Sequence, residues 1–333
     1  MNPQEQWLIL PFMDYLILLA GLTVLIVGGE ALVRGAVGCS AALKISPLVI
    51  GMTVVSFGTS APELLVSTQS ALAGNPGIAM GNVVGSNIAN IALVLGITVL
   101  IFPIVVDRHT KIIDYPMMLL ATALFYFFAL GGSIERWEGA ILVGILIAFT
   151  ASLIVSSRKK TKAKQEDNEF ESAMRMPFWK AFSFLLVGLV ALYFGADWFV
   201  KGAVGIAEEL LADNPDKDSI IGVTVVAFGT SAPELVASTV AAFRKQSDIS
   251  VGNLIGSNIF NIFAVIGVTS IVTPIGVSHE VFHFDMIWMI GISLALIPLL
   301  LLGKRIGRLK GSILFVSYLT YVVVILLKIQ GMI

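Results

Sequence analysis

The stretch Gly58-Thr-Ser-Ala-Pro-Glu-Leu64 occurs a second time in the chain, as Gly229-Thr-Ser-Ala-Pro-Glu-Leu235. It belongs to a longer duplication, because residues 51–98 align with residues 222–269 at a constant offset of 171, without a gap and with 27 identities in 48 positions. A proline directly before a lone acid, inside an apolar segment, predicts a helix that is interrupted beside a carboxylate. The duplication therefore predicts two matching halves, each with one interrupted helix.

The composition is that of a membrane protein. Of the 333 residues, 57% are hydrophobic and only 13% are charged, whereas about a quarter of the residues of a soluble domain are charged. The formal net charge of -1 gives no electrostatic argument for a nucleic-acid partner. A single cysteine excludes an intramolecular disulfide, and three histidines are too few for most imidazole-built metal sites. We expect an integral membrane protein and not an enzyme.

A helix needs about 20 apolar residues to cross the hydrocarbon layer, and the apolar runs predict ten such spans. They lie near residues 13–33, 46–72, 79–105, 112–130, 139–156, 179–209, 219–243, 250–276, 284–302 and 311–328. Five spans in each half would place the two copies in the membrane with opposite orientation. The predicted fold class is an all-α polytopic membrane protein, with ten transmembrane helices arranged as two inverted five-helix repeats.

The predicted organisation has three parts. Residues 1–156 form the first repeat, with the duplicated core at 46–105, and residues 179–333 form the second, with its core at 219–276. Between them, residues 157–178 are polar and charged, which is typical of a solvated linker.

The distribution of basic residues predicts the orientation. When alternate loops are grouped, 17 of the 21 Lys and Arg residues fall in one group and four in the other. By the positive-inside rule, the richer group faces the cytoplasm. We therefore expect a protein of the plasma membrane (the cell inner membrane) with both termini outside and the 157–178 loop in the cytoplasm.

Each half contains one isolated acid. The only charged side chain from residue 45 to residue 106 is Glu63, and the only one between Asp218 and Arg244 is Glu234. An acid at mid-span costs about 2.5–3.5 kcal/mol, and unpaired intramembrane carboxylates usually mark an ion or proton path. These two glutamates are therefore the first candidates for a functional site.

The neighbouring oxygen atoms predict which cations such a site would bind. Two bidentate carboxylates and the backbone carbonyls near Thr59 and Thr230 would supply six or more oxygens, which suits calcium better than magnesium. Nearby hydroxyl and amide oxygens suit sodium, and no cofactor is expected. The candidate metal-binding residues are Glu63, Glu234, Thr59, Ser60, Thr230, Ser231, Ser86, Ser257, Asn90 and Asn261.

Two carboxylates that face each other also favour exchange over free flow. Closing an empty site would bury unpaired charge at large cost, whereas calcium or several sodium ions would cancel that charge. Protons could neutralise both acids as well. A cation channel remains an alternative from another class. An intramembrane hydrolase is disfavoured, because neither Ser60 nor Ser231 has a basic partner within its segment.

The two motifs together resemble the α-repeats of the sodium/calcium exchanger family, within the calcium/cation antiporter superfamily. Besides the first motif, Gly85-Ser-Asn-Ile88 followed by Asn90 recurs as Gly256-Ser-Asn-Ile259 followed by Asn261. The resemblance covers nearly the whole chain. It implies ten helices, a central calcium site on the two glutamates, flanking sodium sites, and alternating access by sliding of the first and sixth spans. Glycines that would permit sliding are Gly21, Gly28, Gly35, Gly38, Gly188, Gly195, Gly202 and Gly205.

The chain departs from the family pattern at one position. Some relatives carry an aspartate where this chain has Asn261, so this site has two fixed acids instead of three. We expect a sodium/calcium antiporter, and a proton- or potassium-coupled calcium exchanger on the same fold is the alternative. The expected partners are calcium and sodium ions and membrane lipid, without nucleic acid and without an obligatory protein partner.

Overall fold

The computed structural model describes residues 3–165, 176–212, 217–221, 224–225, 227–301, 305–330 and 332. Within these residues, eight helices are long and apolar enough to cross a membrane, and a pair of helices bent by 42° can form a ninth span. The predicted span 219–243 passes through positions outside the described residues and ends in a shorter apolar helix, Ala232–Phe243. The polytopic helical fold is confirmed, while the count of ten spans stays a prediction.

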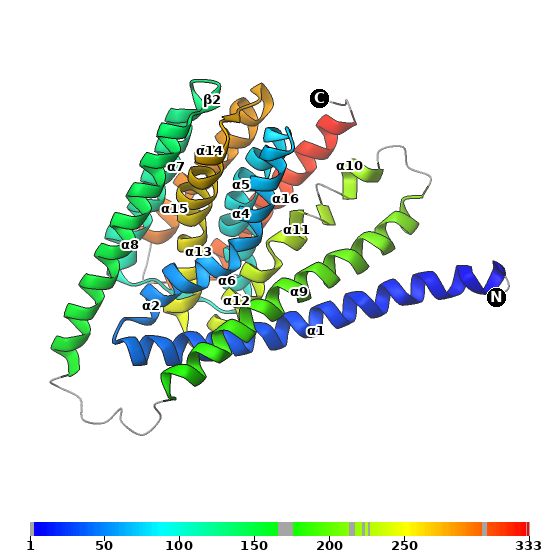
Figure 1. Ribbon diagram of the computed structural model, residues 1–333. Coiled ribbons are helices and arrows are strands. Elements are labelled where there is room, and N and C mark those ends of the chain that lie inside the picture. The colour runs from blue at the N-terminus through cyan, green and yellow to red at the C-terminus, as the bar shows by residue number, and fades with distance from the viewer. Residues whose placement is uncertain are drawn as a thin grey trace.

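The helices of the two halves follow one another in matching order (Figure 1). The first half contains α1 (Pro3–Leu43), α2 (Pro47–Ile50), η1 (Gly51–Val55), α3 (Ser56–Thr59), α4 (Ala61–Leu72), α5 (Pro76–Ile88), η2 (Ala89–Leu95), α6 (Gly96–Ile101), β1 (Ile104–Val105), η3 (Thr110–Asp114), α7 (Tyr115–Ala129), β2 (Ser133–Ile134) and α8 (Arg136–Gln165). The second half contains α9 (Phe178–Leu210), α10 (Lys217–Ile221), α11 (Ala227–Thr230), α12 (Ala232–Phe243), α13 (Ser247–Phe260), η6 (Asn261–Ile266), α14 (Gly267–Val272), β3 (Ile275–Gly276), η7 (Val281–Asp285), α15 (Met286–Leu301), β4 (Arg305–Ile306) and α16 (Arg308–Ile329). Segments labelled η are π-helical.

Two short antiparallel sheets connect the halves at opposite ends of the bundle. Strand β1 pairs with β4, with Ile104 opposite Ile306, and β2 pairs with β3, with Ser133 opposite Gly276. Strands β1 and β3 occupy matching positions at the offset of 171. Each sheet joins two loops of the same predicted group, one group rich in bases and the other poor. The pairing therefore agrees with the alternation of loops that the sequence predicts.

Hydrogen bonds between the halves show the same two-fold relation. Thr68 Oγ1 lies 3.0 Å from Thr269 Oγ1, and Thr98 Oγ1 lies 3.2 Å from Thr239 Oγ1. The offset of 171 converts Thr68 into Thr239 and Thr98 into Thr269, so the two bonds exchange with each other. Helices α4 and α12 thus each contact the opposite half in an equivalent way, and the duplicated cores form the centre of the bundle.

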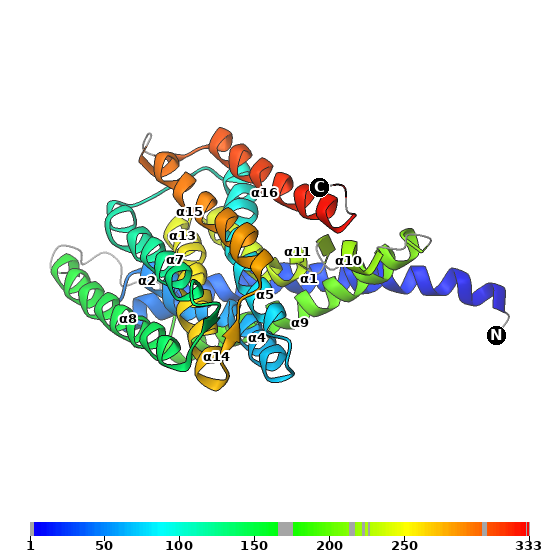
Figure 2. The ribbon, with the colours of Figure 1, turned by 90° about the horizontal axis from the view of Figure 1, so that it is seen from above.

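Helices α1 and α9 form a separate layer. They run side by side and strongly inclined across the bundle in Figure 1, and Figure 2 shows them extending beyond it. An added Cβ at Gly28 would lie 2.8 Å from the Ala191 Cβ, and one at Gly195 would lie 2.8 Å from the Leu25 amide nitrogen. Real Cβ atoms do not approach other atoms so closely. The predicted small-residue faces are therefore the faces on which the two helices meet.

Two predicted boundaries differ from the structure. Helix α1 extends well beyond the predicted span 13–33, from Pro3 to Leu43. Helix α8 continues past residue 156 as far as Gln165, so the first part of the predicted linker 157–178 is helical. That part is rich in lysine, which has a high helix propensity once the helix is already formed. Residues 166–175 of the linker lie outside the described part of the chain.

Candidate cation site

Each duplicated motif contains a helix interrupted at one residue. Ser60 separates α3 from α4 with φ -89° and ψ 2°, and Ser231 separates α11 from α12 with φ -88° and ψ 2°. Pro62 and Pro233 lie in the first turn of the helix that follows, where the missing N–H is tolerated but would break a continuous helix. The predicted interruption is confirmed. It is narrower than an unwound turn, because the helical geometry resumes after a single residue.

The interruption places each lone acid at a helix N-terminus. Glu63 lies in the first turn of α4 and Glu234 in the first turn of α12, where the helix dipole favours negative charge. Their side chains are 2% and 1% exposed, and they lie close enough for their charges to interact. Among the described residues, Glu63 Oε2 and both carboxylate oxygens of Glu234 have no hydrogen-bond partner.

The other predicted site residues lie in the same core. Seven of them are buried and Thr230 is half-buried; the seven are Thr59, Ser60, Ser86, Asn90, Ser231, Ser257 and Asn261. The hydroxyls of Ser60 and Ser231 and both amide atoms of Asn90 and Asn261 make no hydrogen bond within the described part of the chain. Buried polar groups are nearly always hydrogen-bonded in proteins. This set of unsatisfied oxygens, arranged symmetrically, therefore has the character of a ligand site.

One contact brings residues of the two repeats directly together. Thr59 Oγ1 lies 3.4 Å from Ser257 Oγ and 3.3 Å from the side-chain oxygen of Asn253. Nearby, the Ser56 hydroxyl is within 3.0 Å of the Asn253 carbonyl oxygen. The interrupted helix of the first half thus packs against α13 of the second. In the described residues, no group of three or more His, Cys, Asp or Glu side chains could hold a metal ion, so a cation would depend on two carboxylates with hydroxyl, amide and carbonyl oxygens.

Two hydrogen bonds that lie one helical turn after the two glutamates were not predicted from the sequence. Asn82 Nδ2 donates to Ser67 Oγ at 2.9 Å, and Asn253 Nδ2 donates to Ser238 Oγ at 3.0 Å. Each serine lies four residues after one of the two glutamates, on the same face of its helix. The recurrence of a serine four residues after each glutamate could have indicated these bonds from the sequence alone. The bonds join α4 to α5 and α12 to α13, which fixes the helices that carry the acids.

Replacing Asn253 by leucine is expected to destabilise the protein, because the variant leaves the fully buried Ser238 hydroxyl without its partner. An unsatisfied buried polar group costs about 1–3 kcal/mol. Thermal unfolding of the detergent-solubilised protein measures the effect. The equivalent Asn82→Leu is the matched control, because Ser67 is as deeply buried as Ser238. Asn82 is itself half-buried and lacks the additional hydrogen bond that Asn253 accepts from Thr59, so the melting temperature of this control should fall less. Equal losses would contradict the assignment.

The π-helical segments were not predicted. Asn90 lies at the start of η2, and Asn261 is the first residue of η6. An extra residue in a helical turn changes the direction of the side chains beside it, and such turns are frequent at functional sites. Both segments are otherwise apolar and fully buried, so the sequence has no periodic pattern that could reveal the change.

Inverted repeats whose helices are interrupted at mid-span define a secondary transporter, and buried acids at the interruptions suit positively charged cargo. The chain belongs to the sodium/calcium exchanger family: the family model described as sodium/calcium exchanger protein matches residues 13–155 and 180–327. The family that the sequence motifs resemble is thereby confirmed, and with it an integral membrane protein of the exchanger class.

Individual relatives match over nearly their whole length. The chain is 38% identical to the putative antiporter CaxA of Alkalimonas amylolytica, over 91% of this chain and 95% of the relative. It is 33% identical to the sodium/calcium exchanger MaX1 of Methanosarcina acetivorans, over 94% and 98%. Among solved structures, the sodium-calcium exchanger NCX_Mj soaked with zero Na+ and Ca2+ matches with a TM-score of 0.79 at 30% identity, over 94% of this chain and 99% of the other.

Proposed function

We propose that this protein exchanges sodium for calcium across the membrane by alternating access at a site between Glu63 and Glu234. The observation that carries the proposal is the pair itself. One acid comes from each repeat, both are almost completely buried, and their charges interact without a basic partner among the described residues. The printed names of the relatives, antiporter and sodium/calcium exchanger, support the same function.

A calcium ion between the two carboxylates would cancel both charges. Oxygen atoms from the symmetric hydroxyl and amide set would complete the 6–8 ligands that calcium takes, and sodium ions would use the same oxygens when calcium leaves. If the empty site closed, two carboxylates would stay buried without compensation, at a cost of several kcal/mol. The carrier therefore changes sides when loaded and not when empty, which makes the transport an obligatory exchange.

Helix α9 is the element best placed to control access. An added Cβ at Gly58 would contact the Leu189 side chain, and one at Gly229 would contact the Val200 side chain. Leu189 and Val200 lie on one face of α9, since eleven residues make just over three full turns. One helix face thus covers both interruptions, and we propose that its movement, together with α1, opens the site alternately to the two sides.

The basic loops give the proposed orientation. The group of loops that is richer in Lys and Arg includes the two loops that β1 and β4 join. We propose that this group faces the cytoplasm and that both termini lie outside. We place the protein in the plasma membrane of the cell.

Sodium-loaded vesicles that contain the purified protein test the exchange. They should take up calcium while the sodium gradient lasts and stop when it is dissipated. Uptake that is equally fast without any counter-cation gradient would contradict exchange. Replacing the sodium gradient by a proton or potassium gradient tests the alternative coupling, which the neutral Asn261 favours.

The neutral residue leads to a separate prediction. Asn261→Asp adds a third carboxylate to the site, which must be neutralised by one more positive charge before the site can close. Calcium uptake by this variant should therefore become slower as the pH rises from about 6 to about 9, since a proton is then less available to the new acid. Uptake measured against pH in the same vesicles gives the comparison. Asn90→Asp adds an acid at the symmetric position and should show the same dependence of calcium uptake on pH. If Asn261→Asp has the same pH profile as the unmodified protein, residue 261 does not contribute to the charge of the site.

A further inference from the structure

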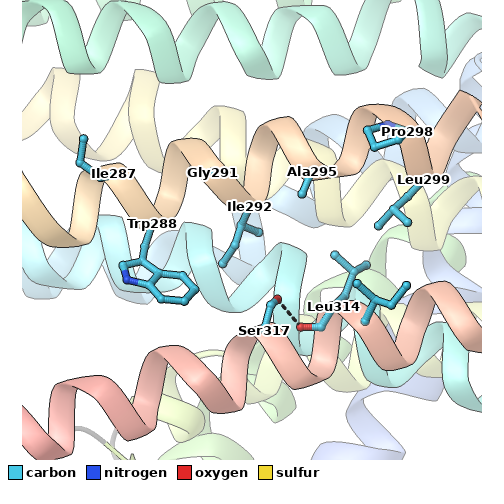
Figure 3. A pocket seen from close by; sticks show the side chains of 10 residues that line it. Ile287, Trp288, Gly291, Ile292, Ala295, Pro298, Leu299, Leu314 and Ser317 are labelled. Atoms are coloured by element: carbon cyan, nitrogen blue, oxygen red, sulfur yellow. Dashed lines mark hydrogen bonds between the residues drawn. The ribbon is translucent and has the colours of Figure 1, made fainter.

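A second feature, away from the acids, is an apolar groove between α15 and α16. Figure 3 shows its walls, and its volume is about 530 Å³. The residues that matter for the argument are Trp288, Gly291, Ala295, Pro298 and Leu299 on α15 and Leu314 on α16. Cavities of about 300–1,000 Å³ are typical of ligand sites.

The sequence explains why the two helices leave this space. Gly291 and Ala295 give α15 two small residues on one face, and Pro298 interrupts the hydrogen bonding of the helix near its end. On the other wall, the Ser317 hydroxyl donates to the Leu314 carbonyl at 2.6 Å, as the dashed line in Figure 3 marks. The serine is thereby satisfied by its own helix, so the groove offers carbon surface to an occupant.

The length of the groove matches one half of a bilayer. Trp288 and Leu299 line its two ends along α15, and eleven residues at about 1.5 Å each correspond to about 16 Å. Half of a hydrocarbon core of about 30 Å is about 15 Å. At one end the Trp288 ring packs against the Tyr321 ring, with centroids 5.7 Å apart. An extended acyl chain of one leaflet therefore fits the groove from this aromatic pair to the membrane surface.

A basic side chain lies at the other end, and two more are close to it in the sequence. Lys310 Nζ donates to the carbonyl oxygen of Leu299 at 2.6 Å and to that of Arg305 at 3.3 Å, so its ammonium group lies where the groove ends. Arg305 and Arg308 are exposed in the same connection. Basic pockets between transmembrane helices bind anionic lipid headgroups. A phosphate at this end of the groove would lie beside the Lys310 ammonium group, within reach of the two exposed arginines of the same connection.

We propose that the α15–α16 groove binds one acyl chain of an anionic phospholipid, whose headgroup phosphate contacts Arg305, Arg308 and Lys310. The proposal is independent of the transported ions. It combines an apolar wall of acyl-chain length with a positive charge cluster at one end, and a zwitterionic lipid of the same chain length would satisfy only the first.

Native mass spectrometry of the full chain tests the proposal. The protein is purified in detergent and mixed with phosphatidylglycerol or phosphatidylcholine. The unmodified protein should retain one phosphatidylglycerol at detergent concentrations that remove phosphatidylcholine. Gly291→Phe should lose this lipid, because no atom lies within 4 Å of an added Cβ at Gly291 and the ring can fill the groove. Gly144→Phe is the matched control, since Gly144 on α8 has the same open surroundings and its variant should keep the lipid.

A charge variant tests the headgroup contact. Arg308→Gln should lower the preference for phosphatidylglycerol over phosphatidylcholine at least fivefold, whereas Arg136→Gln, which removes an exposed base at the start of α8 beside the β2–β3 sheet, should leave it unchanged. Should Gly291→Phe fail to fold, quenching of Trp288 by brominated phosphatidylglycerol in the unmodified protein, with Trp288→Phe as the blank, gives the answer. The proposal is overturned by equal retention of both lipids, by unchanged binding in Gly291→Phe, or by absent quenching.

Discussion

Glu63→Gln should abolish sodium-driven calcium uptake, and Glu234→Gln should do the same. Each substitution keeps the size of the side chain but replaces one acceptor oxygen by an NH2 donor and removes one of two negative charges in a buried site. A bound calcium ion would then keep one uncompensated positive charge. This is the prediction with the largest effect, because it removes the interaction on which the proposed function depends.

The magnitude follows from what a broken buried ion pair costs. Removing one partner is worth about 3–5 kcal/mol, and about 1.4 kcal/mol corresponds to a factor of ten in affinity. Calcium binding should therefore weaken by a factor of about 100 to 4,000. Calcium-45 uptake into sodium-loaded vesicles measures the transport, and calcium-dependent thermal stabilisation of the solubilised protein measures the binding.

The stability of the ion-free protein separates a site residue from a structural one. Three of the four carboxylate oxygens are unsatisfied, and the two negative charges repel each other when no cation is bound, so Glu63→Gln should raise the melting temperature of the ion-free protein while it removes the additional rise that calcium causes. Glu138→Gln is the control, because Glu138 is also buried but accepts the Glu135 amide hydrogen bond at 2.8 Å, far from the motif. This control should keep transport. Full calcium uptake by Glu63→Gln would refute the proposed site.

The sequence predicted those features that depend on a residue type with a strong physical preference. A proline inside an apolar segment removes a helical hydrogen bond and crowds the preceding turn, so an interruption just ahead of Pro62 and Pro233 was predictable, whereas its restriction to the single residues Ser60 and Ser231 was not. The lone glutamates were recognisable because charge is rare in membrane spans. The constant offset of 171 gave the symmetry, and the cross-repeat threonine pairs follow that symmetry without having been anticipated.

Features that depend on packing could not be predicted in this way. The π-helical turns at Asn90 and Asn261 lie among apolar residues whose pattern is the same for any helical geometry. The copies of the motif are nearly identical, yet both interruptions contact α9, through Leu189 and Val200. Such an asymmetry belongs to one conformation of the protein and not to its sequence, because an inverted repeat permits the opposite arrangement equally well.

Gly188→Leu in the α1–α9 interface should reduce exchange at least tenfold and leave calcium binding unchanged. At Gly188 an added Cβ would lie 2.6 Å from the Leu32 Cα, closer than real Cβ atoms come to another atom. The backbones of α1 and α9 therefore have to move apart, or the leucine side chain has to insert into the surface of α1. Either change hinders sliding, because close approach through small residues allows one helix to move along another. Exchange in vesicles and calcium-dependent melting of the same preparation give the two quantities.

This combination distinguishes a moving interface from a static one. If α1 and α9 only pack, Gly188→Leu lowers the melting temperature, and transport falls no more than the folded fraction does. If they slide, transport falls far below the folded fraction, because every cycle has to pass the obstruction while the acids, in other helices, still bind calcium. Gly188→Ala, which adds only the Cβ, should lie between, and Gly144→Leu on the open face of α8 should affect neither quantity. A loss of calcium binding in parallel with transport would show instead that the interface shapes the site and does not gate it.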